Sequence, residues 1–186
     1  MPPTLETFPL IPIGDRIHFY DSFESDRIRS GLPHHAIDIG TARGTMVISS
    51  ITGRVLHQWV AKKDHRTITG CGWSEAGGNI VLILDNAGYV HYFAHMNTAP
   101  LVRAGETVAA GRVLGQVGNT GRLAAGSQTH LHYQVWMIGS GRDAESGSGV
   151  FTRSFGQSVN PYDELVRTAR SLGAQVGGNG GVFIDR

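Results

Sequence analysis

The sequence predicts an all-β domain, and three observations carry that prediction. Glycine accounts for 26 of 186 residues, about twice its usual ~7% share, and much of it falls at turn positions. The stretch Asp85-Asn86-Ala87-Gly88 is a hairpin turn signal and therefore predicts antiparallel pairing of its flanks. Six segments have the length and the β-branched or aromatic content of strands, at residues 45–50, 53–60, 79–84, 89–95, 112–117 and 130–137.

The segments before and between these strands divide the chain. Residues 1–32 have prolines near their start and mixed patterning, and we expect an N-terminal arm that wraps the surface and shapes one edge of a cleft. Residues 33–160 hold all six strand candidates and form the predicted β-domain. Within it, the polar stretch 61–78 and the Gly/Ser-rich stretch 140–148 are predicted to be loops.

One short helix is predicted at residues 161–172, within a C-terminal extension that covers residues 161–186. Asn160 is a suitable N-cap, Pro161 suits the first turn, and Gly173 follows the end. The helix would bury one apolar face made by Leu165, Val166, Ala169 and Leu172. The glycine-rich residues 177–181 are expected to be disordered or to form an edge tail.

The last predicted strand carries a His-x-His pair. Side chains alternate between the faces of a strand, so His130 and His132 share one face and Leu131, Tyr133 and Val135 share the other. Imidazole is the commonest metal ligand in proteins and titrates near neutral pH. Taken alone, such a pair is more often two hydrogen-bonded or surface histidines than a metal site.

A second cluster, His34-His35-Ala36-Ile37-Asp38, supplies further ligand types. Four extended residues span roughly 13 Å, too far for two ligands of one ion, so the segment must bend or Asp38 must begin a strand after a loop that holds His34. Together with one histidine of the later pair, His34 and Asp38 give two nitrogens and one oxygen. That set matches catalytic zinc, whose fourth position is left to water.

These residues and the text between them resemble the lysostaphin-type (LytM) zinc endopeptidases of bacterial cell walls. The matching landmarks run in order from about residue 21 to residue 160: His34-x-x-x-Asp38, then Tyr92-Phe93-Ala94-His95-Met96, then His130-Leu131-His132. Segments 38–47 and 52–55 match as well, and so does the glycine-punctuated segment 102–121. The resemblance implies antiparallel sheets that form a substrate groove, with barrel-sandwich hybrid character.

Carried over residue by residue, the resemblance implies one zinc ion held by His34, Asp38 and His132, with His95 and His130 as the catalytic histidines. A neutral imidazole can take a proton from water and deliver one to a leaving amine, and a second can orient the water or stabilise an oxyanion. We assign His130 as general base and His95 to the second role. The sequence leaves the reverse assignment open.

Four positions depart from the family pattern. Ala36 stands where glycine is usual between the first ligands, and Thr129 and Gln134 replace a common proline and glutamate beside the histidine pair. Phe93 stands where tyrosine is usual, so a hydroxyl that could bind the transition state is missing. Tyr92 points to the opposite face, and we do not expect it to substitute.

Composition excludes several other functions. A net charge of +1 without a basic stripe argues against nucleic-acid binding. Cys71 is the sole cysteine, so an internal disulfide and a zinc-finger spacing are both excluded. No apolar run reaches the ~20 residues of a membrane span, and no signal-peptide pattern precedes Arg16. We expect a monomer that acts on peptidoglycan outside the cytoplasm, exported after loss of a leader, by phage lysis or by a dedicated secretion system.

Three alternatives accompany the prediction of a peptidoglycan endopeptidase. The first is a LytM-like module that binds cell wall or activates an amidase without cleaving anything. The second is a metal-dependent peptidase for D-amino-acid dipeptides, which the absence of Glu-x-x-His and His-Glu-x-x-His motifs disfavours. The third is a barrel-like carrier domain, favoured by the glycine-turn pattern of residues 108–117, which leaves the five site residues unexplained. The sequence does not name the bond cleaved.

Overall fold

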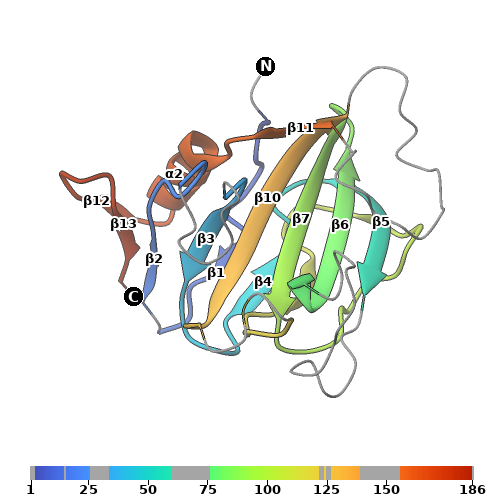
Figure 1. Ribbon diagram of the computed structural model, residues 1–186, viewed down its shortest axis with the longest axis horizontal. Helices are drawn as coiled ribbons and strands as arrows, with labels where there is room; N and C mark the ends of the chain where they lie inside the picture. Colours follow the sequence, from blue (N-terminus) through green and yellow to red (C-terminus); the bar gives the residue numbers. More distant parts are fainter. Residues whose placement is uncertain are drawn as a thin grey trace.

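Two antiparallel sheets make up most of the part of the chain that the structure describes (Figure 1). The computed structural model describes residues 3–14, 16–25, 34–59, 76–121, 124, 127–138 and 156–185, with the backbone alone at residues 57–59. The predicted loop at 140–148, residues 61–75 of the predicted loop at 61–78, and Cys71 lie outside the described residues.

The smaller sheet has the order β1-β4-β9 and consists of β1 (Leu10–Ile11), β4 (Met46–Ile48) and β9 (Val113–Gln116). The larger sheet has the order β12-β13-β2-β3-β10-β7-β6-β5-β8, with β11 paired to β10 beyond this path. Its members are β2 (Ile17–Phe19), β3 (Ile37–Gly40), β5 (Gly53–Trp59), β6 (Asn79–Asp85), β7 (Tyr89–Met96), β8 (Thr107–Val108), β10 (His130–Ile138), β11 (Gly156–Val159), β12 (Gln175–Val176) and β13 (Val182–Ile184).

The all-β prediction is confirmed, and each of the six predicted strands corresponds to an observed one. The long strand β10 crosses the middle of the larger sheet, between β3 and β7 (Figure 1). Its register pairs His132 with Asp38 on one side and with Ala94 on the other. Since directly paired residues point to the same face, this register fixes which side chains can meet at the site.

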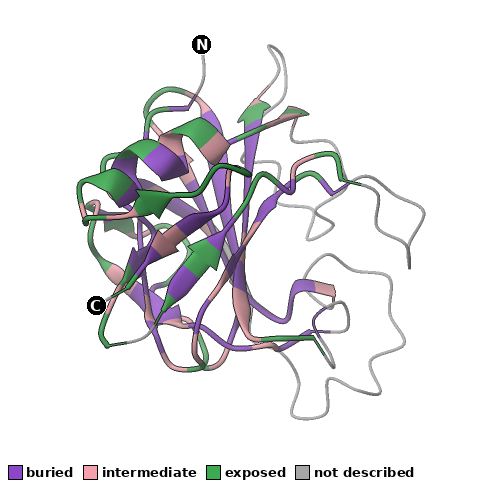
Figure 2. Ribbon diagram, turned by 90° about the vertical axis from the view of Figure 1, so that its left-hand side faces the viewer, coloured by how far each residue is buried: buried purple, intermediate pink, exposed green. Residues whose placement is uncertain are grey.

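The main core lies between the sheets and under the helix, and the strand interiors are buried (Figure 2). The N-terminal arm differs from its prediction as a surface wrap, because Leu5, Phe8 and Leu10 are each only 1% exposed and belong to this core. A separate apolar cluster covers the other face of the larger sheet and is made by Ile80, Leu82, Val90, Tyr92, Ala94 and Trp136.

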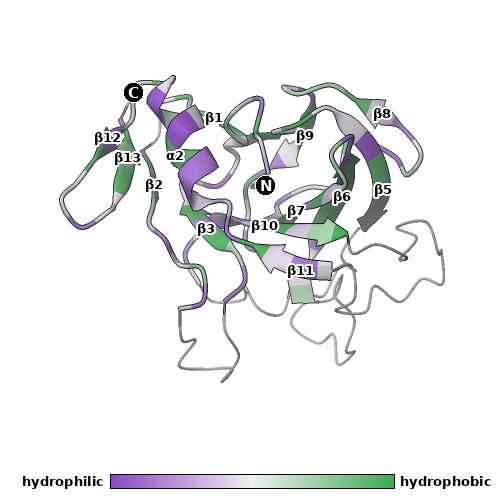
Figure 3. Ribbon diagram, turned by 90° about the horizontal axis from the view of Figure 1, so that it is seen from above, coloured by the Kyte–Doolittle hydropathy of each residue, from purple (hydrophilic) through white to green (hydrophobic). Residues whose placement is uncertain are grey.

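Helix α2 (Tyr162–Arg170) confirms the predicted C-terminal helix and is shorter at both ends. Pro161 is its N-cap, and the Asn160 side-chain oxygen accepts the Tyr162 N–H at 3.0 Å. The chain leaves the helix through Gly173, whose φ of +84° suits glycine. The helix buries Leu165, Val166 and Ala169 and carries hydrophilic residues elsewhere, visible as alternating colours in Figure 3.

The two ends of the chain meet in the larger sheet. Strand β2, from the expected N-terminal arm, pairs with β13, from the expected C-terminal tail, and also with β3. Residues 177–181 connect β12 to β13, with Gly177 N–H donating to the Gly181 carbonyl at 2.8 Å. The division of the chain at residues 32 and 160 stays a prediction.

Candidate metal centre and active site

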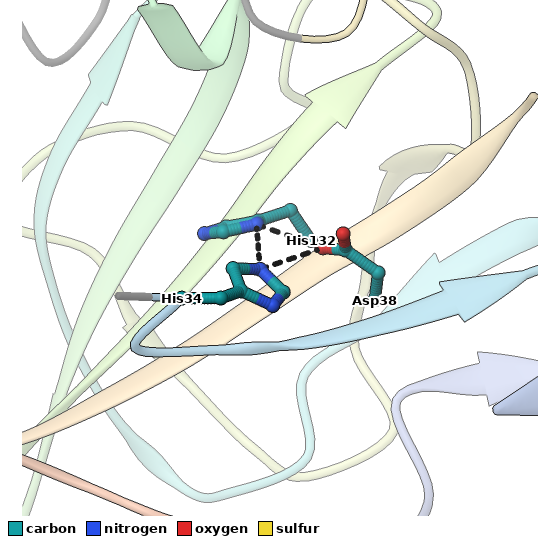
Figure 4. A group of neighbouring side chains, drawn as sticks. All are labelled: His34, Asp38 and His132. Carbon is teal, nitrogen blue, oxygen red and sulfur yellow. Dashed lines mark hydrogen bonds and ion pairs between the residues drawn. The ribbon is translucent and has the colours of Figure 1, made fainter. Parts of the chain in front are cut away.

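Three side chains from two neighbouring strands and the preceding loop converge at one end of the larger sheet (Figure 4). His34 Nε2 lies 3.3 Å from Asp38 Oδ1, His132 Nδ1 lies 2.9 Å from the same oxygen, and the two nitrogens lie 3.4 Å apart. The loop position of His34 and the start of β3 just before Asp38 provide the bend that the sequence required.

The donor set fits zinc. Ligands that lie about 2.0–2.1 Å from a tetrahedral zinc are separated from one another by roughly 3.3 Å, and the three observed separations of 3.3, 2.9 and 3.4 Å are close to that value. Two imidazoles and one carboxylate are also the ligand types zinc accepts. Among the described residues this is the cluster of histidine and carboxylate groups able to hold a metal.

The electrostatics of Asp38 favour a ligand. Burial desolvates its carboxyl and by itself would raise the pKa, but the His132 and His34 imidazoles beside it overcome that effect and hold the pKa well below its usual range. Asp38 is therefore a carboxylate at neutral pH, ready to bind a cation. Its side chain retains 34% exposure, so solvent reaches the cluster.

His34 is oriented by a residue that the sequence reading missed. Its Nδ1 lies 3.0 Å from the Ser22 carbonyl, and because a carbonyl can only accept, Nδ1 carries the proton and Nε2 keeps its lone pair for a metal. The Ser22 hydroxyl also accepts the Asp38 N–H at 3.3 Å and donates to the Ala36 carbonyl at 3.3 Å. Ser22 thus supports both ligands of the first cluster.

His130 lies beside the His34, Asp38 and His132 cluster. Its Nε2 is 3.8 Å from Asp38 Oδ1, and its Nδ1 donates to the Gln128 carbonyl at 2.8 Å. In the neutral imidazole this contact places the proton on Nδ1 and leaves Nε2 as the acceptor. The side chain is 14% exposed, which places it at the boundary between the protein and solvent.

His95 joins the cluster through an unusual backbone conformation. Its φ is +64°, rare for a residue with a β-carbon. Its ring contacts those of His130 and His132, with centroids 5.0 and 5.5 Å apart. Simple alternation along β7 would place His95 on the face of Phe93, so the left-handed backbone is what turns its ring toward the site.

The environment of His95 keeps it neutral. Burial removes solvent from the imidazole, and the nearby His132 and His130 disfavour a further positive charge, so its pKa is lowered to about 3. Its Nδ1 donates to the Thr120 carbonyl at 2.8 Å, which leaves Nε2 as an acceptor. The side chain therefore accepts rather than donates toward the site at neutral pH.

The expectation about Tyr92 and Phe93 is wrong in its choice of face. Phe93 pairs directly with Tyr133 and both lie in the main core. Tyr92 instead lies on the face of His132, and its ring meets the His132 ring edge-on with centroids 5.8 Å apart. The prediction placed Phe93 on the same face as His95 by strand alternation. It was wrong because the positive φ of His95 interrupts that alternation.

Two further departures from the family pattern, Thr129 and Gln134, have polar partners here. Thr129 donates through its hydroxyl to the Thr41 carbonyl at 2.6 Å and ties the start of β10 to the end of β3. Gln134, which is 5% exposed, donates through its side-chain amide to the Ser158 hydroxyl at 3.2 Å. Both residues support strands next to the cluster.

An all-β domain that presents a His-Asp-His cluster with two further histidines belongs among the lysostaphin-like β-proteins with a candidate metal site. The catalytic domain of lysostaphin from Staphylococcus simulans superposes with a TM-score of 0.55 at 22% identity, over 80% of this chain and 91% of that one. A structure titled as a putative glycyl-glycine endopeptidase lytM from Ruminococcus gnavus superposes with a TM-score of 0.63 at 24% identity, over 90% of this chain and 61% of that one.

The chain belongs to peptidase family M23, which it matches over residues 32–145. It is 30% identical over 129 residues to the murein hydrolase activator NlpD of Escherichia coli, over 69% of this chain and 25% of that protein. It is 37% identical over 70 residues to the L-Ala--D-Glu endopeptidase of Bacillus subtilis, over 35% of this chain and 22% of that protein. The chain therefore spans about a quarter of the length of these relatives.

Proposed function

We propose that this chain is a zinc-dependent endopeptidase that hydrolyses peptide bonds in bacterial peptidoglycan, a crosslink or a stem peptide. The observation that carries the proposal is the convergence of the five predicted residues. His34, Asp38 and His132 bring their ligand atoms within 4.8 Å of one another. His130 lies 3.8 Å from Asp38, and His95 contacts both later histidines.

In this proposal one zinc ion per chain is held by His34, Asp38 and His132. When bound, zinc supplies Lewis-acid polarisation of the scissile carbonyl and makes a coordinated water more acidic. The chain contributes the ligand geometry, through the Ser22 carbonyl behind His34 and the strand pairing behind Asp38 and His132.

His130 acts as the general base. Its Nδ1–H is held by the Gln128 carbonyl, so Nε2 accepts the proton of the attacking water and, once protonated, delivers it to the leaving amine. Its partial exposure, against 4% for His95, gives it the easier access to water and substrate.

His95 orients the attacking water. It is neutral at pH 7 and its protonated nitrogen is occupied by the Thr120 carbonyl. A ring of this kind accepts a hydrogen bond from water but has no proton to donate to an oxyanion. Of the two roles first considered for His95, we therefore retain orientation of the water.

A non-cleaving role is the second candidate, and one observation favours it. The relative that matches 69% of this chain is named a murein hydrolase activator. A module of this kind would bind the cell wall or a wall hydrolase through the same domain and would release no fragments by itself.

The two candidates separate in one assay on purified peptidoglycan. Protein as isolated, chelated and zinc-restored is compared by turbidity loss and by mass spectrometry of released fragments. Zinc-restorable release of peptide fragments supports the endopeptidase and identifies its bond. Absence of release from several wall chemotypes by the zinc-loaded protein overturns it in favour of the activator.

The place of action follows from the substrate. Peptidoglycan lies outside the cytoplasm, so we propose that the protein acts in the periplasm, in the wall or as a secreted or phage-borne factor, as a monomer and without nucleic acid. Across the parts of the chain that the structure describes, no helix has the length and hydropathy to cross a membrane.

A further inference from the structure

Thr120 contacts the His95 ring and the backbone of the next residue. Its carbonyl accepts the His95 Nδ1–H at 2.8 Å, and its hydroxyl donates to the carbonyl of the next residue, Met96, at 2.7 Å. The same hydroxyl accepts the Asn79 backbone N–H at 3.0 Å. Thr120 is 5% exposed, so these contacts are made away from water.

These contacts surround a strained residue. His95 has a φ of +64°, and a residue with a β-carbon persists in that region only where its surroundings impose it. The Asn79 side-chain amide adds a second donor to the Met96 carbonyl, at 2.9 Å. The carbonyl of Met96, the residue after His95, is therefore held by two donors. Thr120 contacts both this carbonyl and the His95 ring.

Two glycines fix the position of Thr120. Gly78 and Gly121 have φ values of +73° and +89°, and their backbones touch. A β-carbon at Gly78 would lie 2.3 Å from the Thr120 hydroxyl oxygen, and one at Gly121 would lie 2.4 Å from the Gly78 nitrogen. The segment before β6 thus presses directly on Thr120, which leaves it little freedom to move.

We propose that Thr120 is a positioning residue for His95. By anchoring the Met96 carbonyl, its hydroxyl supports the left-handed backbone of His95. Its carbonyl fixes the proton on Nδ1 and leaves Nε2 as the acceptor of a ring that contacts His130 and His132. The inference rests on the proposed function, because the consequence for turnover requires a hydrolase. Threonine suits the position because it supplies a donor and an acceptor at one oxygen.

The test compares Thr120→Val, which keeps the shape and removes the hydroxyl, with Thr120→Ser, which keeps the hydroxyl. Thr168→Val is the matched control: Thr168 is 3% exposed and donates to the Glu164 carbonyl at 2.9 Å, but it lies on α2. Each variant is measured for zinc content, for fragment release and for the ¹⁵N signals of the His95 imidazole. Those signals are assigned by their loss in His95→Ala.

We expect Thr120→Val to keep zinc, to release fragments on the order of 10- to 100-fold more slowly, and to lose the Nδ1–H signature of His95. Thr120→Ser restores the signature and most of the rate, and Thr168→Val changes neither. A loss of stability alone would leave the imidazole signals of the folded protein unchanged.

Unchanged His95 signals and rate in Thr120→Val overturn the proposal. If Thr120→Val does not fold, Thr120→Ala gives the same comparison, because alanine removes the hydroxyl without placing a methyl group where the hydroxyl was. If the wild-type protein releases no fragments, the proposed function fails, and the imidazole signals alone decide whether Thr120 positions His95.

Discussion

Strands β7 and β10 carry histidines in two clusters, and the clusters use their polar atoms differently. At the candidate metal centre, three ligand atoms point at one another around a common point. In the main core, His91 lies 3.2 Å from Asp85 through Nε2 and 2.7 Å from the Tyr133 hydroxyl through Nδ1. The Tyr133 hydroxyl in turn lies 2.8 Å from that of Ser50.

The core cluster is a one-directional chain of hydrogen bonds. The Asp85 carboxylate can only accept, so His91 Nε2 donates to it, Nδ1 accepts from Tyr133, and Tyr133 accepts from Ser50. Both ring nitrogens of His91 therefore have hydrogen-bond partners, Asp85 and Tyr133. Contact between a histidine and an aspartate is therefore not enough to indicate a metal site. A candidate metal site also needs ligand atoms that converge on one position, and hydrogen-bond partners that hold the imidazole protons on the other ring nitrogens.

The largest effect is expected from His132→Ala, at the cluster whose atoms converge. Loss of one of three ligands should reduce zinc from about one per chain to near zero and abolish fragment release. His34→Ala and Asp38→Ala should do the same, while His91→Ala should keep zinc. Elemental analysis checks this, and unchanged zinc content in all three ligand variants would refute the ligand assignment.

The next effect separates catalysis from metal binding. His130→Ala and His95→Ala should each retain zinc and lose turnover on the order of 10²- to 10⁴-fold, the usual contribution of a positioned acid or base. Rates of fragment release normalised to zinc content measure this. Near wild-type rates in both variants would show that the catalytic roles are misassigned.

A smaller effect, on stability, is expected from the core cluster. Tyr133→Phe removes the hydroxyl shared by His91 and Ser50 and should lower the free energy of unfolding by about 1–3 kcal/mol, because buried partners are left unsatisfied. Zinc content should stay unchanged. Tyr20→Phe is the control, since Tyr20 is 60% exposed. Equal free energies of urea unfolding for the two variants would show that the hydrogen bonds of Tyr133 do not contribute to stability.

The smallest effect is a pH dependence of stability. Burial lowers the pKa of His91, an effect that its contact with Asp85 only partly offsets, so the folded protein keeps this ring neutral. An unfolded histidine takes up a proton as pH falls below about 6.5, so the contribution of His91 is present above that pH and is lost as pH falls.

Asp85 acts in the same direction at lower pH. Burial alone would raise its pKa, but hydrogen bonds from His91 and from the Tyr89 and Ala87 backbone lower it. Its contribution is present above the unfolded value of about 3.9 and is lost as pH falls further. His91→Gln should flatten the decline of stability between pH 7 and pH 5, measured by urea unfolding at each pH; an unchanged slope would show that His91 does not contribute.

The strands that could be predicted from the sequence are those long enough to show an alternating pattern of side chains. The segments that became β5, β6, β7 and β10 have seven to nine residues each, enough for alternation to be visible. Strands β1, β8 and β12 have two residues each and carry no such pattern. They exist because neighbouring strands offer backbone partners, which no local sequence reports.

The site was predictable in its side chains and not in its supports. The five residues that converge are those that the family resemblance implied, and the residue pattern alone had pointed to His34, Asp38 and the His130/His132 pair. The tautomers of His34, His130 and His95 are set by the backbone carbonyls of Ser22, Gln128 and Thr120. Every residue has a backbone carbonyl, so the residue types at these positions give no sign of this role. The wrong prediction for the orientation of Tyr92 has a related cause, because the positive φ of His95 could not be predicted from the sequence.

The central position of β10 has a kinetic consequence. Around His132 this strand is paired on both sides, to Asp38 of β3 and to Ala94 of β7. Among the described residues, β12 at the sheet edge pairs with β13 alone. Amide hydrogens flanked by two strands exchange with solvent deuterium only in the rare global openings, while edge amides exchange through local fraying. On warming, we therefore expect the β12 edge to loosen first, and the part of β10 around His132 to keep its shape until the whole domain melts.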